Sequence, residues 1–416
     1  MSFSFIHLAD IHLGRPFSGL SEFSCIELEA DIYENAVEKS LKKVFNFAVD
    51  KKVDFILVAG DTFDNTEFDI SSKFIFKNFL KRLEKENIQV FVICGNHDPI
   101  FSYNKNTFDF DENSLIKIAG LNAPLTTKLP FYNKNSELAG YIYSVSFSEE
   151  KFNGNLFENC DTLNQNHFNI ALLHCDVEGK TDSPYAPCSI TELKSFNFDY
   201  CALGHIHTPK ELAENIHYVG SLQGRNIKEK GEHGIRYICV ENNKIVSNSF
   251  IPMDVVRYDD LEVDLSITSD DTTAIELIIN KLKQLVTSQQ NPCEVYLISL
   301  KLVGNVSFYS LINQDFNKMI IKKSQDIQVA EIYFSKIENS TSPKVDEEIL
   351  KNDDGILGEI YKLLNCTEEI EDLYSKTFND IEKVCLGDLD KEQIINLVKQ
   401  EGKNLCHNIY SDKQEE

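Results

Sequence analysis

The sequence is short of basic residues. It has 41 Lys and Arg against 66 Asp and Glu, which gives a formal net charge of −25 over 416 residues. A protein coated with basic surface for holding nucleic acid is therefore excluded, although a local basic groove is still compatible with this charge. The acidity is greatest toward the C-terminus, because residues 345–416 carry 8 basic and 19 acidic side chains.

The sequence also lacks paired cysteines and long apolar runs. Its 11 cysteines are odd in number, and none of them forms a Cys-x-x-Cys pair. Scattered cysteines of this kind indicate reduced, mostly buried thiols rather than a disulfide framework. No segment reaches the roughly 18 apolar residues that span a membrane, and the opening MSFSFIHLAD has no basic region of the kind that begins a signal peptide. We therefore expect a cytoplasmic protein that does not enter a membrane.

Hydrophobic residues make up 42% of the chain, which is enough to build two or three domains. Over residues 1–255, short apolar runs alternate with amphipathic stretches, and this pattern predicts a layered α/β domain. Residues 256–340 follow with the pattern of a small α+β unit, and the polar ENSTSPKVDEE then reads as a linker. Residues 345–416 are predicted to be helical, with apolar stripes that suit either a self-contained hairpin or a partner surface.

Five of the predicted strands end in residues that bind metals. These ends are Asp10-Ile11-His12, Gly60-Asp61-Thr62-Phe63-Asp64, Gly95-Asn96-His97-Asp98, His174, and Gly204-His205-Ile206-His207. Ligands gather at the carboxyl ends of the strands in an α/β sheet, so we expect these side chains to share one region. Each motif alone occurs by chance, but the ordered set at successive strand ends predicts a functional site.

This mixture of side chains suits a pair of divalent ions. Two ions about 3.5–4 Å apart can grip a phosphate and generate a hydroxide nucleophile, and a carboxylate must bridge ions held so close. Imidazole and amide groups complete the coordination without adding charge. A set without cysteine favours Mn²⁺ or iron, allows Zn²⁺, and is unlike a structural cysteine–zinc site. A histidine that is not a ligand could protonate the leaving oxygen.

The motifs DIH, GDTFD, GNHD, LLH and GHIH resemble those of the calcineurin-like metallophosphoesterases. The opening HLADIHLG and the later YVGSLQGRNIKEKGEHG resemble the SbcD-type DNA repair nucleases, and the latter especially the YhaO-like bacterial exonuclease branch. The resemblance covers residues 5–240. It implies a β-sandwich flanked by helices, with a small α+β capping domain and a helical C-terminal tail.

The resemblance also implies a role for each motif residue. Asp61 would bridge two metal ions, which we expect to be Mn²⁺. The first ion would be held by Asp10, His12 and His207, and the second by Asn96, His174 and His205. His97 would be the catalytic histidine, and Asp64 would orient it by accepting a hydrogen bond from its ring. Cys175, directly after His174, stands where we expect a small residue, and a thiolate ligand is left open.

The activity implied is that of a two-metal DNA nuclease, an exonuclease in DNA repair. Such nucleases act with an SbcC-like coiled-coil ATPase subunit, and the family suggests a homodimer. Two alternatives stand beside this prediction. One is a phosphoesterase acting on small molecules or proteins, and the other is a non-catalytic subunit that binds DNA ends or the ATPase.

Several charged residues outside the ligand set have two interpretations each. Lys73, Lys77, Lys81 and Lys85 repeat every four residues and form either a solvated helix face or a phosphate-contact strip. Arg15 and the Arg225–Lys228–Lys230 cluster are better candidates for contact with the DNA backbone. Asp98 is expected to cap a helix after the GNHD turn.

Overall fold

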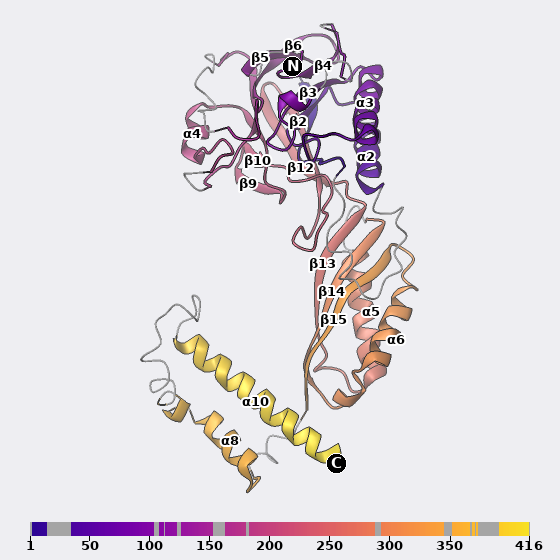
Figure 1. Cartoon of the computed structure of the whole chain (residues 1–416), viewed down its shortest axis with the longest axis vertical. Coiled ribbons are helices and arrows are strands. Elements are labelled where there is room, and N and C mark those ends of the chain that lie inside the picture. The colour runs from indigo at the N-terminus through magenta and orange to yellow at the C-terminus, as the bar shows by residue number, and fades with distance from the viewer. Residues whose placement is uncertain are drawn as a thin grey trace. The chain divides into compact units, whose positions relative to one another are not determined.

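In the computed structural model, the chain forms two compact units (Figure 1). The residues described are 2–14, 35–103, 108–111, 113–122, 126–152, 163–179, 183–287, 293–344, 352–366, 368–370, 372 and 391–415. One unit comprises Met1–Asp259, Gln289–Leu297 and Val329–Tyr333, and the other comprises Asp260–Ser288, Ile298–Gln328 and Phe334–Glu416. The domain boundaries expected from the sequence stay predictions.

The first sheet of the larger unit has the strand order β12-β11-β1-β2-β3-β4. Its strands are β1 (Ser2–Leu8), β2 (Phe55–Ala59), β3 (Gln89–Ile93), β4 (Ile116–Ile118), β11 (Gly234–Glu241) and β12 (Lys244–Pro252). Strands β1 to β4 run parallel, whereas β11 is antiparallel to both β1 and β12. The carboxyl ends of β1, β2 and β3 therefore lie at one edge of this sheet.

The second sheet has the order β5-β6-β7-β8-β10-β9. Its strands are β5 (Thr126–Tyr132), β6 (Leu138–Val145), β7 (Phe168–His174), β8 (Tyr200–Gly204), β9 (Lys210–Ala213) and β10 (Ile216–Tyr218). Strands β6, β7, β8 and β10 are parallel, and the antiparallel β5 and β9 close the two ends. The ends of β7 and β8 thus also meet at one edge.

The two sheets pack face to face over a phenylalanine-rich layer. Phe5 and Phe55 stack with ring centroids 4.8 Å apart, and Phe131 from the second sheet lies 4.5 Å from Phe55. Every second residue of the central strands points into this layer, and the others point outward under helices. Because both faces of these strands are buried, the strands appear in the sequence as the short apolar runs from which a layered α/β domain is predicted.

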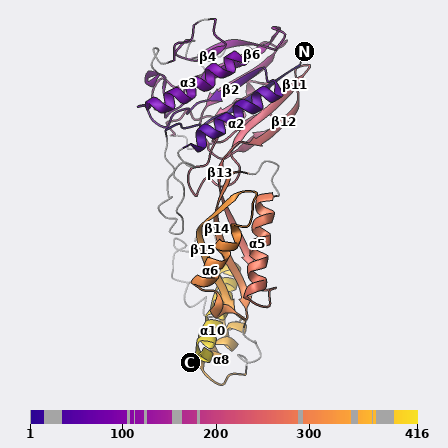
Figure 2. The ribbon, with the colours of Figure 1, turned by 90° about the vertical axis from the view of Figure 1, so that its right-hand side faces the viewer.

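Helices cover the outer faces of both sheets. Figure 2 shows α2 (Ala36–Lys51) and α3 (Ile70–Lys85) side by side over the first sheet, and α4 (Ile190–Ser195) packs on the second. The carboxylate of Asp69 caps α3 by accepting a hydrogen bond from the Ser72 amide, 2.8 Å away. The inward face of α3 is formed by apolar side chains, since Phe76, Phe79, Leu80 and Leu83 are buried. The predicted layered α/β sandwich with flanking helices is confirmed.

The smaller unit is built around a three-stranded sheet of order β13-β14-β15. Its elements are β13 (Val256–Asp264), α5 (Asp271–Thr287), β14 (Val295–Val306), α6 (Gln314–Ser324) and β15 (Glu331–Pro343), and both helices lie on one face of the sheet in Figure 1. The predicted linker at residues 338–348 is wrong in its first part. β15 continues to Pro343, and Thr341 and Ser342 are buried although they are polar. Residues 345–348 lie outside the described part of the chain.

The described part of the C-terminal region contains two longer helices. They are α8 (Ile356–Asn365) and α10 (Lys391–Glu415), which pack against each other through Leu357, Tyr361 and Cys406 (Figure 1). Among the described residues, no helix is long and apolar enough to cross a membrane.

Candidate metal centre

The predicted strand ends converge in the folded chain. Side chains that follow β1, β2 and β3 meet those that end β7 and follow β8, so both sheets contribute to one cluster at the edge of the sandwich. Three overlapping groups have ligand atoms within 4.8 Å of one another, namely Asp10, His12 and His207; Asp10, Asp61 and His174; and His12, Asp64 and His97. The cluster is formed by residues up to 197 positions apart in the sequence, from Asp10 to His207.

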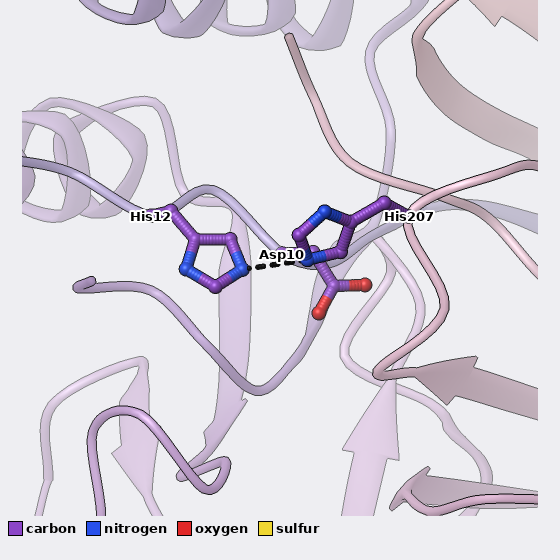
Figure 3. Close-up of side chains that lie close together, drawn as sticks. All are labelled: Asp10, His12 and His207. Carbon is purple, nitrogen blue, oxygen red and sulfur yellow. Dashed lines mark hydrogen bonds between the residues drawn. The ribbon is translucent and has the colours of Figure 1, made fainter. Parts of the chain in front are cut away.

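Asp10, His12 and His207 form the first half of the cluster (Figure 3). The Nε2 atoms of His12 and His207 lie 3.0 Å apart. The Nδ1 atom of His12 is 3.1 Å from an Asp64 carboxylate oxygen, and the Nδ1 atom of His207 is 3.1 Å from Glu229 Oε1. Since a carboxylate fixes the proton on Nδ1, both Nε2 atoms present lone pairs to each other. Two lone pairs at this distance fit a cation between them.

Asn96, His174 and His205 form the second half. The His174 Nδ1–H donates to the Ala59 carbonyl at 2.9 Å, which leaves its Nε2 as an acceptor. That Nε2 lies 3.0 Å from Asn96 Oδ1, and His205 Nδ1 lies 3.2 Å from the same oxygen. In this half too, nitrogen and oxygen atoms with lone pairs converge on one point with too few hydrogen-bond donors between them. A divalent ion at that point would accept these lone pairs.

Asp61 lies between the two halves. Its Oδ2 is 3.7 Å from His12 Nε2 on one side and 3.5 Å from His174 Nε2 on the other. Its Oδ1 accepts a hydrogen bond of 2.9 Å from the His97 amide. This placement suits a carboxylate that bridges two ions.

The backbone of the cluster is held in an unusual conformation. Asp10, His12, Asp61 and His205 have φ values of 48°, 47°, 49° and 102°, in a region that residues with a side chain rarely adopt. Gly60, with φ of 85°, adopts such a conformation readily, and a Cβ there would lie 2.5 Å from the His174 ring. Strain of this kind persists where the surrounding structure enforces it, and it concentrates at functional sites.

Burial and neighbouring charges set the protonation of these groups. Burial lowers the pKa of His12 to about 4 and that of His205 to about 3, so both rings are neutral at pH 7, as metal ligands must be. Burial also disfavours a charge on His174, but the Asp61 carboxylate outweighs burial and raises the pKa of His174 to about 9, so an ion must displace a proton from this ring. Burial disfavours the Asp61 carboxylate, but the His174 ring outweighs burial and holds the pKa of Asp61 well below its usual range. The central carboxylate is therefore ionised.

Residues 3–209 match the family described as calcineurin-like phosphoesterase. A curated relative, the uncharacterized metallophosphoesterase YhaO of Bacillus subtilis (strain 168), is 29% identical over 289 residues, which cover 68% of each chain. Residues 3–209 are a calcineurin-like phosphoesterase domain. This match assigns a metal-dependent phosphoesterase, and the three groups of clustered ligand atoms fit that assignment.

Two solved structures resemble this metallophosphoesterase. TT1561 of Thermus thermophilus superposes with a TM-score of 0.35 and 11% identity, over 60% of this chain and 99% of that one. A dimetal phosphatase from Danio rerio superposes with a TM-score of 0.34 and 9% identity, over 60% of this chain and 97% of that one.

The structure changes the expected role of Asp64 in the metallophosphoesterase site. The His97 ring does bond to residue 64, but Nδ1 lies 2.8 Å from the main-chain carbonyl oxygen rather than from the carboxylate. The carboxylate contacts His12 instead. His97 is therefore oriented by the backbone of the GDTFD turn, and the Asp64 side chain acts on a predicted metal ligand. His97 itself is exposed, as a group that meets substrate must be.

Three other expectations are corrected. Asp98 caps no helix, since its buried carboxylate accepts from the amides of Thr62, Phe63 and Gly95 and so ties the GNHD turn to the GDTFD turn. Cys175 is buried in an apolar cluster and belongs to none of the three ligand groups, so the thiolate ligand left open above finds no support.

The third correction concerns Arg225. It is only 2% exposed, so the expected contact with a DNA backbone is wrong for this residue. Lys228 and Lys230 are exposed, and Arg15 lies outside the described residues. The contact between Glu229 and His207 was not predicted from the sequence. Glu229 lies 22 residues after His207, in a loop without a recognised metal-ligand motif.

Binding of metal is expected to stabilise the larger unit. An ion that binds only the folded chain, at 100 times its Kd, adds about 2.7 kcal/mol of stability. For a domain of this size, the Tm should then rise by about 5–10 °C. Differential scanning calorimetry of EDTA-treated protein, with and without Mn²⁺, measures the change. An identical Tm under both conditions would contradict a metal site at this cluster.

Proposed function

We propose that the protein is a two-metal DNA nuclease, an exonuclease acting in DNA repair in the cytoplasm. The observation that carries the proposal is the placement of Asp61 between two converging sets of acceptors, with the exposed His97 beside it. A pair of ions flanking one carboxylate suits in-line attack on a phosphodiester. The nitrogen and oxygen donor set favours Mn²⁺.

Asp10, His12 and His207 would hold one ion, and Asn96, His174 and His205 the other, with Asp61 shared. When bound, the ions supply Lewis acidity toward the phosphate oxygens and lower the pKa of water. The chain's own contribution to the chemistry is His97. Its Nδ1–H is directed to the Asp64 carbonyl, which leaves Nε2 free to face the substrate. When the ring carries a proton on both nitrogens, Nε2–H can donate its proton to the departing 3′ oxygen and the ring returns to its neutral form.

Partners belong to the same proposal. We propose that an SbcC-like coiled-coil ATPase binds the C-terminal helices, and that the protein forms a homodimer. The support is an exposed apolar face, since Ile356 of α8 is 79% exposed and Ile360 and Leu363 are also exposed, while the opposite face of the helix packs on α10. Lys81 and Lys85 on the outer face of α3 offer a site for phosphate contact.

The test compares substrates with the same protein preparation. We expect Mn²⁺-dependent shortening of end-labelled duplex DNA, together with hydrolysis of bis(p-nitrophenyl) phosphate. The phosphomonoester p-nitrophenyl phosphate should be cleaved much more slowly. Cleavage of the monoester alone, with intact DNA under the same conditions, would overturn the nuclease and favour a phosphoesterase of small molecules or proteins.

A further inference from the structure

Glu229 lies against one half of the candidate metal centre without belonging to it. The residue comes from the loop of residues 219–233 between β10 and β11, which we call the β10–β11 loop. Its Oε1 is 3.1 Å from His207 Nδ1, and its side chain is only 13% exposed. A carboxylate on the far nitrogen of a ligating histidine fixes its tautomer, orients its ring and raises its basicity.

The same carboxylate is coupled to the DIH turn through Arg225. Glu229 Oε2 accepts a hydrogen bond of 3.0 Å from the Arg225 amide. The buried Arg225 guanidinium donates to the main-chain carbonyl of Ile11, the residue between Asp10 and His12. One short loop therefore contacts both segments that provide the ligands of the first half.

The β10–β11 loop is itself held in a fixed shape. Asn226 donates to Glu229 Oε1 at 2.7 Å, and His233 Nε2 lies 3.3 Å from the Glu229 carbonyl. The Ser221 amide donates to the His207 carbonyl at 2.9 Å. A Cβ at Gly224 would lie 2.8 Å from the Glu229 carbonyl oxygen, so the loop is packed too closely for a larger residue there. The carboxylate of Glu229 is thus placed before any ion binds.

The second half of the centre is oriented by different groups. His174 is fixed by the main-chain carbonyl of Ala59 in β2, and Asn96 and His205 contact each other directly. The Glu229 carboxylate instead bonds to His207 and to the Arg225 and Asn226 nitrogens of its own loop. The rings of His207 and His174 are therefore oriented by separate parts of the fold, although the His205 amide donates to the Asp10 carboxylate and so links the two halves.

We propose that Glu229, supported by Arg225, is a positioning residue that sets the affinity of the first metal position and leaves the second unchanged. This rests on the proposed two-metal function. The consequence is an asymmetric centre, in which a change in the β10–β11 loop converts a two-ion site into a one-ion site.

The test is a Mn²⁺ titration of metal-free protein by calorimetry and electron paramagnetic resonance. The wild-type protein should bind two ions. In Glu229→Gln, which keeps the shape of the side chain but removes its charge, one ion should bind about 10–100-fold more weakly. The other should keep its wild-type affinity, and the spin coupling between paired Mn²⁺ ions should be lost at concentrations that saturate the wild type.

Two further variants keep the result interpretable. Glu232→Gln alters the same loop, but its carboxylate contacts Arg257 rather than a predicted ligand, and both affinities should stay unchanged. Glu229→Asp retains the charge but withdraws it from His207, and it decides the matter if Glu229→Gln does not fold. Unchanged affinities in the Glu229 variants, or equal weakening of both ions, would overturn the inference. A wild-type protein that binds fewer than two ions would instead overturn the proposed function.

Discussion

Replacement of Asp61 by Asn is expected to abolish phosphodiester cleavage and to reduce the bound metal from two ions to one or none. Asn has nearly the shape of Asp but cannot supply negative charge between two cations. Asp61 lies within 3.7 Å of a predicted ligand in each half of the centre, so both halves lose the same group. Because paired ions contribute several kcal/mol of transition-state stabilisation, the rate should fall by at least about 10³-fold.

Elemental analysis and cleavage assays on one preparation measure both effects. The matched control is Asp199→Asn, which removes a carboxylate that accepts a hydrogen bond of 2.7 Å from the Asn169 amide. That variant should keep both ions and its activity. An Asp61→Asn protein that is fully loaded with metal and fully active would remove Asp61 from the centre.

The convergence of the candidate ligands could be predicted because the sequence carries a simple signal there. Buried strands such as FILVA of β2 are followed at once by charged or imidazole groups, and parallel strands bring their ends to one edge. The layered fold could be predicted for the same reason, since both faces of the central strands are buried. Short or polar strands gave no such signal, and β15 continues through residues that resemble a linker.

The supporting contacts could not be predicted, because they depend on tertiary structure. Nothing in GDTFD shows that the carboxylate of Asp64 contacts His12 while its main-chain carbonyl accepts from His97. Likewise, an arginine in a polar segment suggests solvent exposure, and only the fold places Arg225 under the DIH turn. Residue types at strand ends specify which groups gather, whereas loop packing specifies how each ring is turned.

Replacement of His97 by Ala should separate catalysis from metal binding. His97 is exposed, and its amide, rather than its ring, bonds to Asp61. That main-chain hydrogen bond survives the substitution, so Asp61 keeps its position and both ions should stay bound. Loss of a general acid typically costs about 10²–10⁴-fold in rate. We therefore expect kcat to fall by that factor at unchanged metal content.

The choice of substrate sharpens this test. A phosphodiester with a p-nitrophenol leaving group needs little protonation, so the His97→Ala variant should lose much less activity toward it than toward DNA. His167→Ala is the matched control, because His167 stacks edge-on against Tyr141 with ring centroids 5.6 Å apart and belongs to none of the three ligand groups. Full activity of His97→Ala on DNA would sink the assignment of His97. Loss of an ion together with activity would make His97 a ligand, in keeping with its place beside His12 and Asp64.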